Sequence, residues 1–136
     1  MSTSTDASTD ASVAAAVQSA VAAYAHALDA NRIDDLVELF HPDGVAEIAG
    51  VGTFEGHDAI RQGYAAFAPT RPQLHLVGNT VVTSATEDEA TAVSNLAFFQ
   101  RGDSGWAVQL VGRYDDTLRR KDGEWRFQRR VTTFLP

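Results

Sequence analysis

The apolar residues of this chain change their spacing once, near residue 70, and this change limits the folds that the chain can adopt. Before it, apolar side chains recur at the intervals of one helix face, at Val13, Val17, Val21, Tyr24 and Leu28. From Gln73 onward the period is two, which is typical of half-buried strands. Helices followed by a run of strands predict an α+β domain whose two kinds of element form separate layers.

The same pattern places the individual elements. Helices are expected over 13–29, 33–40 and 59–67, the third capped by Asp58, with turns over 41–44 and 52–56. Strands are expected over 45–51, 73–83, 90–101, 106–120 and 124–135. Residues 1–12 are mostly Ser, Thr, Ala and Asp and are predicted to form a disordered tail. Residues 13–136 are then expected to form a single domain.

Composition excludes several classes of site. The 136 residues contain no cysteine, so disulfides, thiolate metal sites and cysteine nucleophiles are ruled out. The net charge of −7 argues against a nucleic-acid partner, which needs clustered Lys and Arg. The four histidines lack metal-ligand spacing, and the sequence has no glycine-rich phosphate loop. We therefore expect neither a metal nor a cofactor.

The location of the protein is predicted from what its segments lack. No segment approaches the ~20 apolar residues that a membrane span needs. The first twelve residues have neither the basic nor the apolar region of a secretory signal. The sequence thus predicts a cytoplasmic protein without a membrane partner.

A carboxylate lies on the face of the strand over 106–120 that alternation assigns to the interior. That face carries Trp106, Val108, Leu110, Gly112, Tyr114, Asp116 and Leu118. A buried carboxylate is costly unless it is paired, protonated or open to a cavity. Two interpretations of Asp116 stay open, an ion pair with Arg129 on the next strand or a role in a site.

Two further polar residues are candidates for acid/base chemistry. His75 lies between large aliphatic residues in the first long strand, where it is either a hydrogen-bonded framework residue or a general acid/base. A free imidazole titrates near ~6.5, so small changes bring it to working pH. Asp29 closes the first helix, an unfavourable end for a carboxylate, which suggests that it acts elsewhere.

A curved sheet over helices leaves a cavity between the layers, and aromatic residues are the candidates to line it. Tyr64, Phe98 and Trp106 are expected there, either as lining or as core. Tyr24, on the apolar stripe of the first helix, is core by default.

The order of segments resembles the NTF2-like superfamily. The segments that carry the resemblance are 24–36, 40–45, 54–60, 113–118 and 122–127. The likeness is greatest to SnoaL-like polyketide cyclases, scytalone dehydratase and ketosteroid isomerase, and it covers about residues 13 to 134. It implies a cone-shaped α+β barrel, with three N-terminal helices packed on a curved mixed or antiparallel sheet. It also implies a homodimer.

The resemblance to scytalone dehydratase reaches individual residues. Asp29 and His75 fall on positions that look like its catalytic aspartate and histidine. Its second histidine corresponds to Gln100, and two of its tyrosines correspond to Leu28 and Ile48. Its full catalytic set is therefore not present.

The resemblance to ketosteroid isomerase concerns a different set of residues. Tyr24 and Asp116 fall where that enzyme keeps two hydrogen-bond donors for an oxyanion, whereas its aspartate base corresponds to Ile48. A carboxylic acid held neutral in an apolar site can donate such a bond, as one does in ketosteroid isomerase. By these correspondences Ile48 and Gln100 join the expected cavity lining, and Tyr114 joins it because alternation places it on the buried face of its strand.

Three functional hypotheses follow. The first is a cofactor-free dehydratase, isomerase or cyclase for a small, largely apolar polyketide-, steroid- or terpenoid-like molecule. In it, His75 moves a proton, Asp29 orients His75, and Tyr24 with a protonated Asp116 or with Tyr114 binds the oxyanion. The second is a binding protein of the same fold without chemistry. The third is an epoxide hydrolase, suggested by Arg113 and Asp115, which resemble the Arg-x-Asp of limonene epoxide hydrolase.

Overall fold

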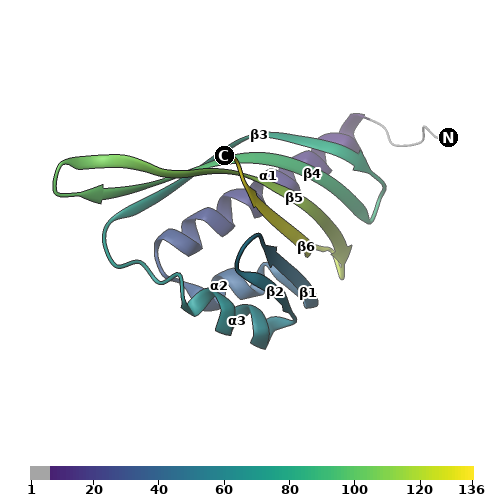
Figure 1. The fold of residues 1–136 in the computed structure, drawn as a ribbon. Coiled ribbons are helices and arrows are strands. Elements are labelled where there is room, and N and C mark those ends of the chain that lie inside the picture. Colours follow the sequence, from purple (N-terminus) through teal and green to yellow (C-terminus); the bar gives the residue numbers. More distant parts are fainter. Residues whose placement is uncertain (1–6) are drawn as a thin grey trace.

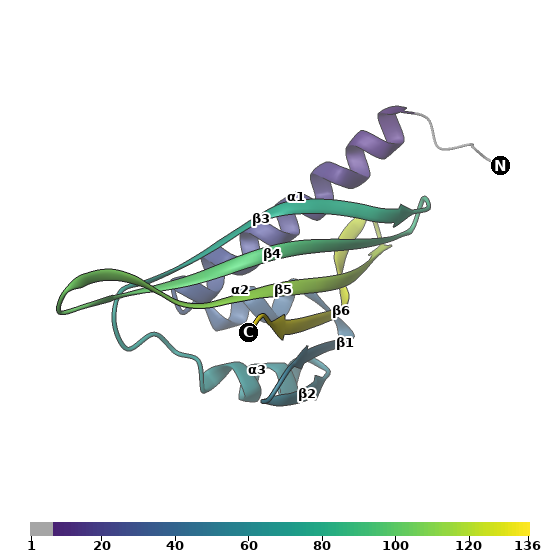
Figure 2. The same ribbon diagram turned by 45° about the horizontal axis from the view of Figure 1, so that its top comes forward.

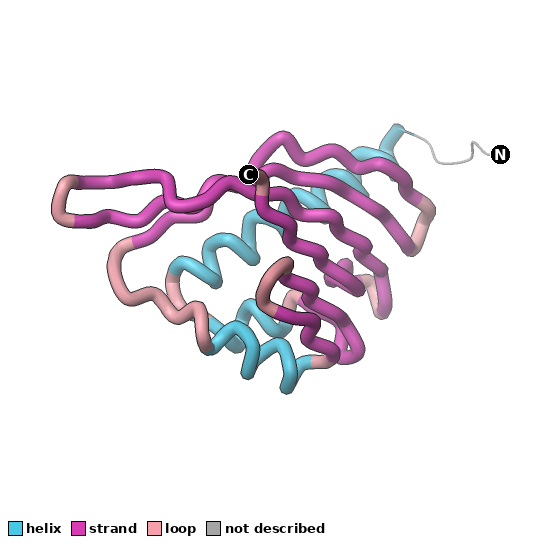
Figure 3. Tube along the Cα trace, in the orientation of Figure 1, coloured by secondary structure: helices cyan, strands magenta, loops and turns pink. Residues whose placement is uncertain are grey.

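The computed structural model describes residues 7–136 and contains helices and strands in two layers (Figure 1, Figure 3). Within these residues the helices are α1 (Ala7–Asp29), α2 (Ile33–Glu38) and α3 (His57–Ala65). The strands are β1 (Phe40–Ile48), β2 (Gly52–Glu55), β3 (Gln73–Ala85), β4 (Glu89–Gly102), β5 (Gly105–Lys121) and β6 (Glu124–Phe134).

The strands form one mixed sheet in the order β2-β1-β6-β5-β4-β3. β1 and β6 run parallel, and the other neighbours are antiparallel. The helices cover one face of this curved sheet (Figure 2), and α1 contacts mainly β3, with fewer contacts to β6 and β4. The predicted fold class, an α+β domain with three helices on a curved mixed sheet, is confirmed.

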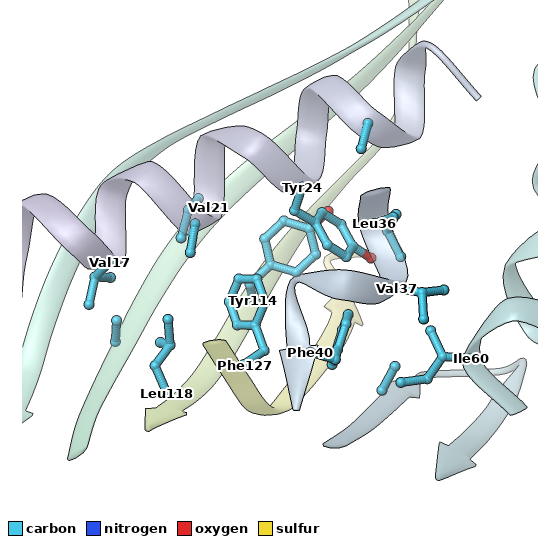
Figure 4. Close-up of a cluster of buried hydrophobic side chains, with 14 of the residues drawn as sticks. Val17, Val21, Tyr24, Leu36, Val37, Phe40, Ile60, Tyr114, Leu118 and Phe127 are labelled. Atoms are coloured by element: carbon cyan, nitrogen blue, oxygen red, sulfur yellow. The ribbon is translucent and has the colours of Figure 1, made fainter. Parts of the chain in front are cut away.

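The core lies between α1 and the middle of the sheet. Val17 and Val21 of α1 are buried against the strands, together with Leu118 of β5 and Phe127 of β6. Figure 4 shows these side chains gathered under the helix. The apolar stripe recognised in the sequence is therefore the surface that joins the two layers.

The first helix begins earlier than expected. α1 starts at Ala7, so residues 7–12 of the predicted disordered tail are helical, and residues 1–6 of that tail lie outside the described part of the chain. Extending a helix that is already packed costs less than nucleating a new one, so these residues continue the helix that follows them. The stretch Ala11–Asp29 also has the length and mean hydropathy (1.3) that a membrane span needs, contrary to expectation, although its apolar face packs in the core here.

The end of α1 fixes the position of Asp29. Asn31 has a positive φ of 55°, and two backbone bonds close the turn around it, from the N–H of Arg32 to the C=O of Ala27 (2.8 Å) and from the N–H of Asn31 to the C=O of Leu28 (3.3 Å). These are the two bonds of a Schellman motif, with asparagine in the left-handed position. The helix therefore stops cleanly, and Asp29 projects toward β3.

Four expectations between residues 38 and 60 are wrong. The second helix ends at Glu38, and the predicted turn over 41–44 belongs to β1, because Phe40 already pairs with Phe127 of β6. The predicted turn over 52–56 contains the short strand β2, which pairs with β1. α3 starts at His57 rather than Ala59, and its N-cap is Gly56 at a φ of 85°, not Asp58. Glycine adopts this left-handed conformation without a Cβ clash.

Two bulges change which residues face the helices. Phe98 pairs with Leu110 but Phe99 pairs with Val108, so Gln109 is an extra residue in β5. An extra residue reverses the alternation of the strand beyond it. Trp106 and Val108 therefore lie on the outer face, each 55% exposed, and the prediction that Trp106 lines the cavity is wrong.

The second bulge lies in β6. Thr117 pairs with Arg129 and Leu118 with Phe127, which leaves Gln128 without a partner in β5. Phe127 and Arg130 are consequently both fully buried, whereas Arg129 is exposed and binds Glu47. The predicted ion pair between Asp116 and Arg129 is therefore wrong, because Arg130 takes that place.

Candidate functional site

A cavity of about 320 Å³ opens between the helices and the inner face of the sheet. Its walls are mostly apolar and aromatic, with a few polar side chains. The lining side chains include Tyr24, Leu28, Ile48, Tyr64, Phe67, Gln73, His75, Leu96, Phe98, Gln100, Leu110, Tyr114, Thr132 and Phe134. Apolar concavities with a few convergent polar groups are the usual form of a small-molecule site.

Strand register aligns the polar residues of one cavity wall. His75 of β3 lies opposite Phe98 of β4, which lies opposite Leu110 of β5. Gln73, two residues before His75, lies opposite Gln100 in the same manner. Because side chains alternate along a strand, these residues all face the cavity. The ring of His75 stacks on Phe98 with centroids 4.5 Å apart.

Asp29 and His75 form a hydrogen-bonded dyad beside the cavity. Nδ1 of His75 donates to Oδ1 of Asp29 at 2.6 Å, and the backbone N–H of His75 donates to Oδ2 at 2.7 Å. Nε2 of Gln73 donates to Oδ1 at 3.1 Å. Both side chains of the dyad are largely covered, with 13% of His75 and 15% of Asp29 exposed.

These bonds set the chemical state of the dyad. Burial raises the pKa of the Asp29 carboxyl, but the bonds from His75 and Gln73 outweigh it, so the pKa is lowered and Asp29 is an anion at neutral pH. An anion at Nδ1 holds the proton of a neutral imidazole on that nitrogen. Nε2 then carries the lone pair, and it is the ring nitrogen that can take a proton from a bound molecule.

Three tyrosines form another part of the cavity wall. The hydroxyls of Tyr24 (α1) and Tyr64 (α3) are hydrogen bonded at 2.5 Å, and the rings of Tyr24 and Tyr114 (β5) meet edge to face at 5.7 Å. Burial raises the pKa of all three hydroxyls above 10.0. They therefore remain protonated at neutral pH. Tyr114 can donate its O–H to a ligand oxygen, and so can whichever of Tyr24 and Tyr64 is the acceptor in their mutual bond.

A buried ion pair lies behind the tyrosines. Nε and one terminal nitrogen of Arg130 donate to the two oxygens of Asp116, at 2.8 and 3.1 Å, and neither side chain is exposed. The guanidinium carbon lies 3.5 Å from the ring centroid of Tyr114 and 4.2 Å from that of Tyr24. The other terminal nitrogen is buried without a partner among the described residues.

This pairing corrects the predicted role of Asp116. The sequence predicts a protonated donor to the ligand, but Asp116 is not among the side chains that line the cavity. The pKa of its carboxyl is raised, because burial outweighs the opposing charge and hydrogen bonds of Arg130. With both oxygens bound to an arginine, the carboxyl is an anion and has no proton to donate.

The structure brings most of the other predicted site residues together. Tyr24, Ile48, Tyr64, His75, Phe98, Gln100 and Tyr114 all line the cavity, and Asp29 lies behind His75. Gln73, Thr132 and Arg130 also belong to this region, although the sequence patterns did not single them out. Gln73 was detectable, because it shares the strand face of His75, whereas Arg130 was concealed by the bulge at Gln128.

Two other proposed features can be placed. Arg113 and Asp115 bind each other at 3.1 Å on the outer side of the sheet, each about half exposed and away from the cavity. This position argues against the epoxide hydrolase hypothesis. Within residues 7–136, no group of three or more His, Asp or Glu side chains is arranged to hold a metal ion.

Comparison with known proteins identifies the family. The model of the SnoaL-like domain matches residues 9–131, which is most of the chain. The chain belongs to the SnoaL-like domain family. The resemblance found in the sequence is thereby confirmed, and similar solved structures include an NTF2-like protein with a cystatin-like fold from Novosphingobium aromaticivorans.

Two mycobacterial relatives of this SnoaL-like domain are described only as uncharacterized proteins. One from Mycobacterium tuberculosis (strain H37Rv) and one from Mycobacterium bovis are each 31% identical over 116 residues, which cover 81% of this chain and 77% of theirs. They support the family without adding an activity.

Solved structures of similar fold include enzymes. A protein from Novosphingobium aromaticivorans that is proposed to be a scytalone dehydratase has a TM-score of 0.85 at 25% identity, over 96% of this chain and 89% of that one. A hexachlorocyclohexane dehydrochlorinase, LinA type 2, has a TM-score of 0.83 at 16% identity, over 96% and 90%. The second likeness shows the fold alone.

Because the pKa of Asp29 is lowered, this SnoaL-like domain should lose stability in acid. A depressed carboxyl pKa contributes stability that is present above the unfolded value, 3.8, and lost as pH falls through the folded value. We expect Asp29→Asn to lower the free energy of unfolding at pH 7 and to flatten the loss of stability below pH 3.8. Urea unfolding of both proteins between pH 7 and pH 2.5 measures this. A variant with an unchanged acid slope would contradict the assigned state of Asp29.

Because of the bulge at Gln109, we expect two aromatic residues of this SnoaL-like domain to affect ligand binding differently. Phe98→Ala should weaken the binding of an apolar fluorophore about tenfold, because Phe98 lines the cavity and supports the ring of His75. Trp106→Ala should leave that affinity unchanged, because Trp106 lies on the outer face. Fluorescence titration of both variants measures the difference. Equal losses would show that the probe binds outside the cavity.

Proposed function

We propose that this SnoaL-like domain is an acid/base enzyme that removes a proton next to a carbonyl group in a small, largely apolar molecule. One observation carries the proposal. A histidine on the cavity wall has its Nδ1 bonded to a partly buried carboxylate at 2.6 Å, which leaves Nε2 for the bound molecule. This is the arrangement of a general base whose tautomer and orientation are set by a neighbouring anion.

The proposed step conserves protons and charge. Nε2 of His75 takes the proton from the carbon next to the carbonyl, and the electron pair of the broken C–H bond forms the enolate. The charge develops on the carbonyl oxygen, where the hydroxyl of Tyr114, or that of Tyr24 or Tyr64, donates a hydrogen bond. Asp29 stabilises the imidazolium that results.

The enolate then has three outcomes, which correspond to three classes of reaction. Return of the proton from His75 to another carbon gives an isomerase. Loss of a β-hydroxyl, protonated by His75 to leave as water, gives a dehydratase. Attack of the enolate carbon on a second carbonyl, whose oxygen then takes the proton from His75, gives a cyclase. The mostly apolar walls favour a polyketide-, steroid- or terpenoid-like molecule, and about 320 Å³ lies at the small end of ligand sites, which span ~300–1,000 Å³.

A specific observation favours a second candidate, a binding protein without chemistry. Gln100 and Ile48 line the cavity at positions where the enzymes that this chain resembles carry a histidine, a tyrosine or an aspartate. Neither of these two side chains can transfer a proton at neutral pH. In that case the cavity would retain its ligand unchanged.

Proton exchange in heavy water separates the two candidates. The purified protein is incubated with cyclohexanone, 2-tetralone, a steroid ketone and a cyclic β-hydroxy ketone, and NMR follows hydrogen replacement at the α-carbon and loss of water. The proposed enzyme exchanges or dehydrates at least one of them faster than buffer does. Binding of these compounds without exchange would instead support the binding protein, and neither binding nor exchange would contradict both candidates.

A further inference from the structure

The buried pair of Arg130 and Asp116 has no place in the proton transfer described above, although it lies directly behind the tyrosines. Arg130 and Asp116 are both inaccessible to solvent. The guanidinium is enclosed by three aromatic rings, with centroids of Tyr114, Tyr24 and Phe127 at 3.5, 4.2 and 4.6 Å. Two of these rings belong to cavity-lining tyrosines.

Retaining this ion pair is costly. Replacement of a buried ion pair by apolar residues of similar size is often neutral or stabilising, so such a pair is weak evidence of a purely structural need. One terminal nitrogen of Arg130 is moreover buried without a hydrogen-bond partner among the described residues. An unpaired donor of this kind carries a desolvation cost that packing alone does not explain.

The cation of the pair is the charge for which the geometry shows direct contact with the tyrosine rings. The cation contacts the faces of both rings, whereas Asp116 binds the side of the guanidinium through its two carboxylate oxygens. In a low-dielectric interior the nearer charge dominates. In agreement, Arg130 lowers the pKa of each of the three tyrosine hydroxyls more than Asp116 raises it, while burial has the largest effect on each.

We propose that Arg130 is a positioning residue that acts through Tyr24 and Tyr114, so that the tyrosine part of the cavity selects ligands with negative charge on an oxygen attached to a planar carbon, as in an enolate or a phenolate. Asp116 holds the guanidinium against the rings and moderates its charge. The inference rests on the proposed function, because it assigns the recognition of the enolate oxygen to this end of the same site. It extends that function to a ligand preference that is measurable without turnover.

Two variants separate the charge from the fold. Asp116→Asn keeps the shape and a hydrogen-bond acceptor for Arg130 but removes the anion. The double variant Asp116→Leu with Arg130→Met removes both charges and leaves no buried group unpaired, so it is expected to fold. If Arg130 acts through its charge, the two variants change the affinity for phenolate relative to phenol in opposite directions. If its role is purely structural, both variants change this affinity in the same direction.

The readout is the ionisation of bound 4-nitrophenol, followed by absorbance against pH and compared with the free compound. In the wild-type protein we expect bound 4-nitrophenol to ionise at lower pH than free 4-nitrophenol. Asp116→Asn changes the buried charge by one unit and should increase the affinity for phenolate relative to phenol about tenfold. The double variant leaves the net charge unchanged but removes the cation that faces the tyrosine rings, so it should decrease this ratio by a smaller factor.

Every other outcome overturns the inference. Shifts of the same sign in the two variants, no shift in either, or no ionised nitrophenol on the wild-type protein would each show that Arg130 does not charge the cavity. The proposed function is tested separately, by proton exchange. A protein that exchanges no α-proton can still bind a phenolate. If the two variants shift in opposite directions but the protein exchanges no α-proton, the anion preference holds and belongs to a binding protein.

Discussion

Replacing His75 with glutamine should reduce the rate of α-proton exchange by about 10²–10⁴-fold, the usual contribution of a general base. Glutamine can still donate to Asp29 but cannot take a proton at neutral pH. Because His75 lies on the cavity wall and keeps some exposure, the substitution should leave the fold intact. The measurement is the exchange rate by NMR for whichever ketone the wild-type protein turns over, with circular dichroism as a check on folding.

A matched control uses another histidine of the chain. His26 is exposed on α1 and does not line the cavity, so His26→Gln should leave the exchange rate unchanged. Ligand affinity separates chemistry from binding, since His75→Gln should change the turnover number far more than the dissociation constant. Equal rates for His75→Gln and the wild-type protein would remove His75 from the mechanism.

Replacing Arg130 with methionine should lower the free energy of unfolding by about 3–5 kcal/mol, the largest stability effect that we expect. The substitution leaves the carboxylate of Asp116 buried without its partner, and breaking a buried pair in this way is strongly destabilising. Urea unfolding at pH 7 measures the change as a lower transition midpoint at an unchanged slope.

The neighbouring residue supplies the control for this prediction. Arg129 precedes Arg130 directly, but it is exposed and pairs with Glu47 at the surface. Arg129→Met should therefore cost no more than about 1 kcal/mol. Adding Asp116→Leu to Arg130→Met should recover most of the lost stability, because no unpaired charge then remains. Similar losses for the two single variants would contradict the side-chain directions assigned by the bulge at Gln128.

Much of the fold could be predicted from the sequence because hydrophobic period is a local property. The spacing from Val13 to Leu28 located the first core helix, and the later period of two located β3 to β6 within a few residues. The short strand β2 was missed because its four residues, from Gly52 to Glu55, carry too little alternation to differ from a turn. Its pairing with β1 depends on contacts that are distant in sequence.

The candidate site was predictable to the extent that strand alternation held. Alternation and family resemblance together placed His75, Phe98 and Gln100 on the cavity wall. They failed for Trp106 and for the partner of Asp116, because each error lies beyond a bulge. A single inserted residue leaves no mark in apolar composition, yet it turns every later side chain of the strand to the other face. The predicted homodimer and cytoplasmic location stay predictions.

The central claim, that His75 presents Nε2 to a bound molecule while Asp29 holds Nδ1–H, is tested most directly by nitrogen-15 NMR of the histidine side chains. The account predicts a proton on Nδ1 that faces Asp29, and a change in the Nε2 signal when a ketone or 4-nitrophenol enters the cavity. The opposite tautomer, or a His75 whose signals ignore every ligand shown to bind, would contradict it.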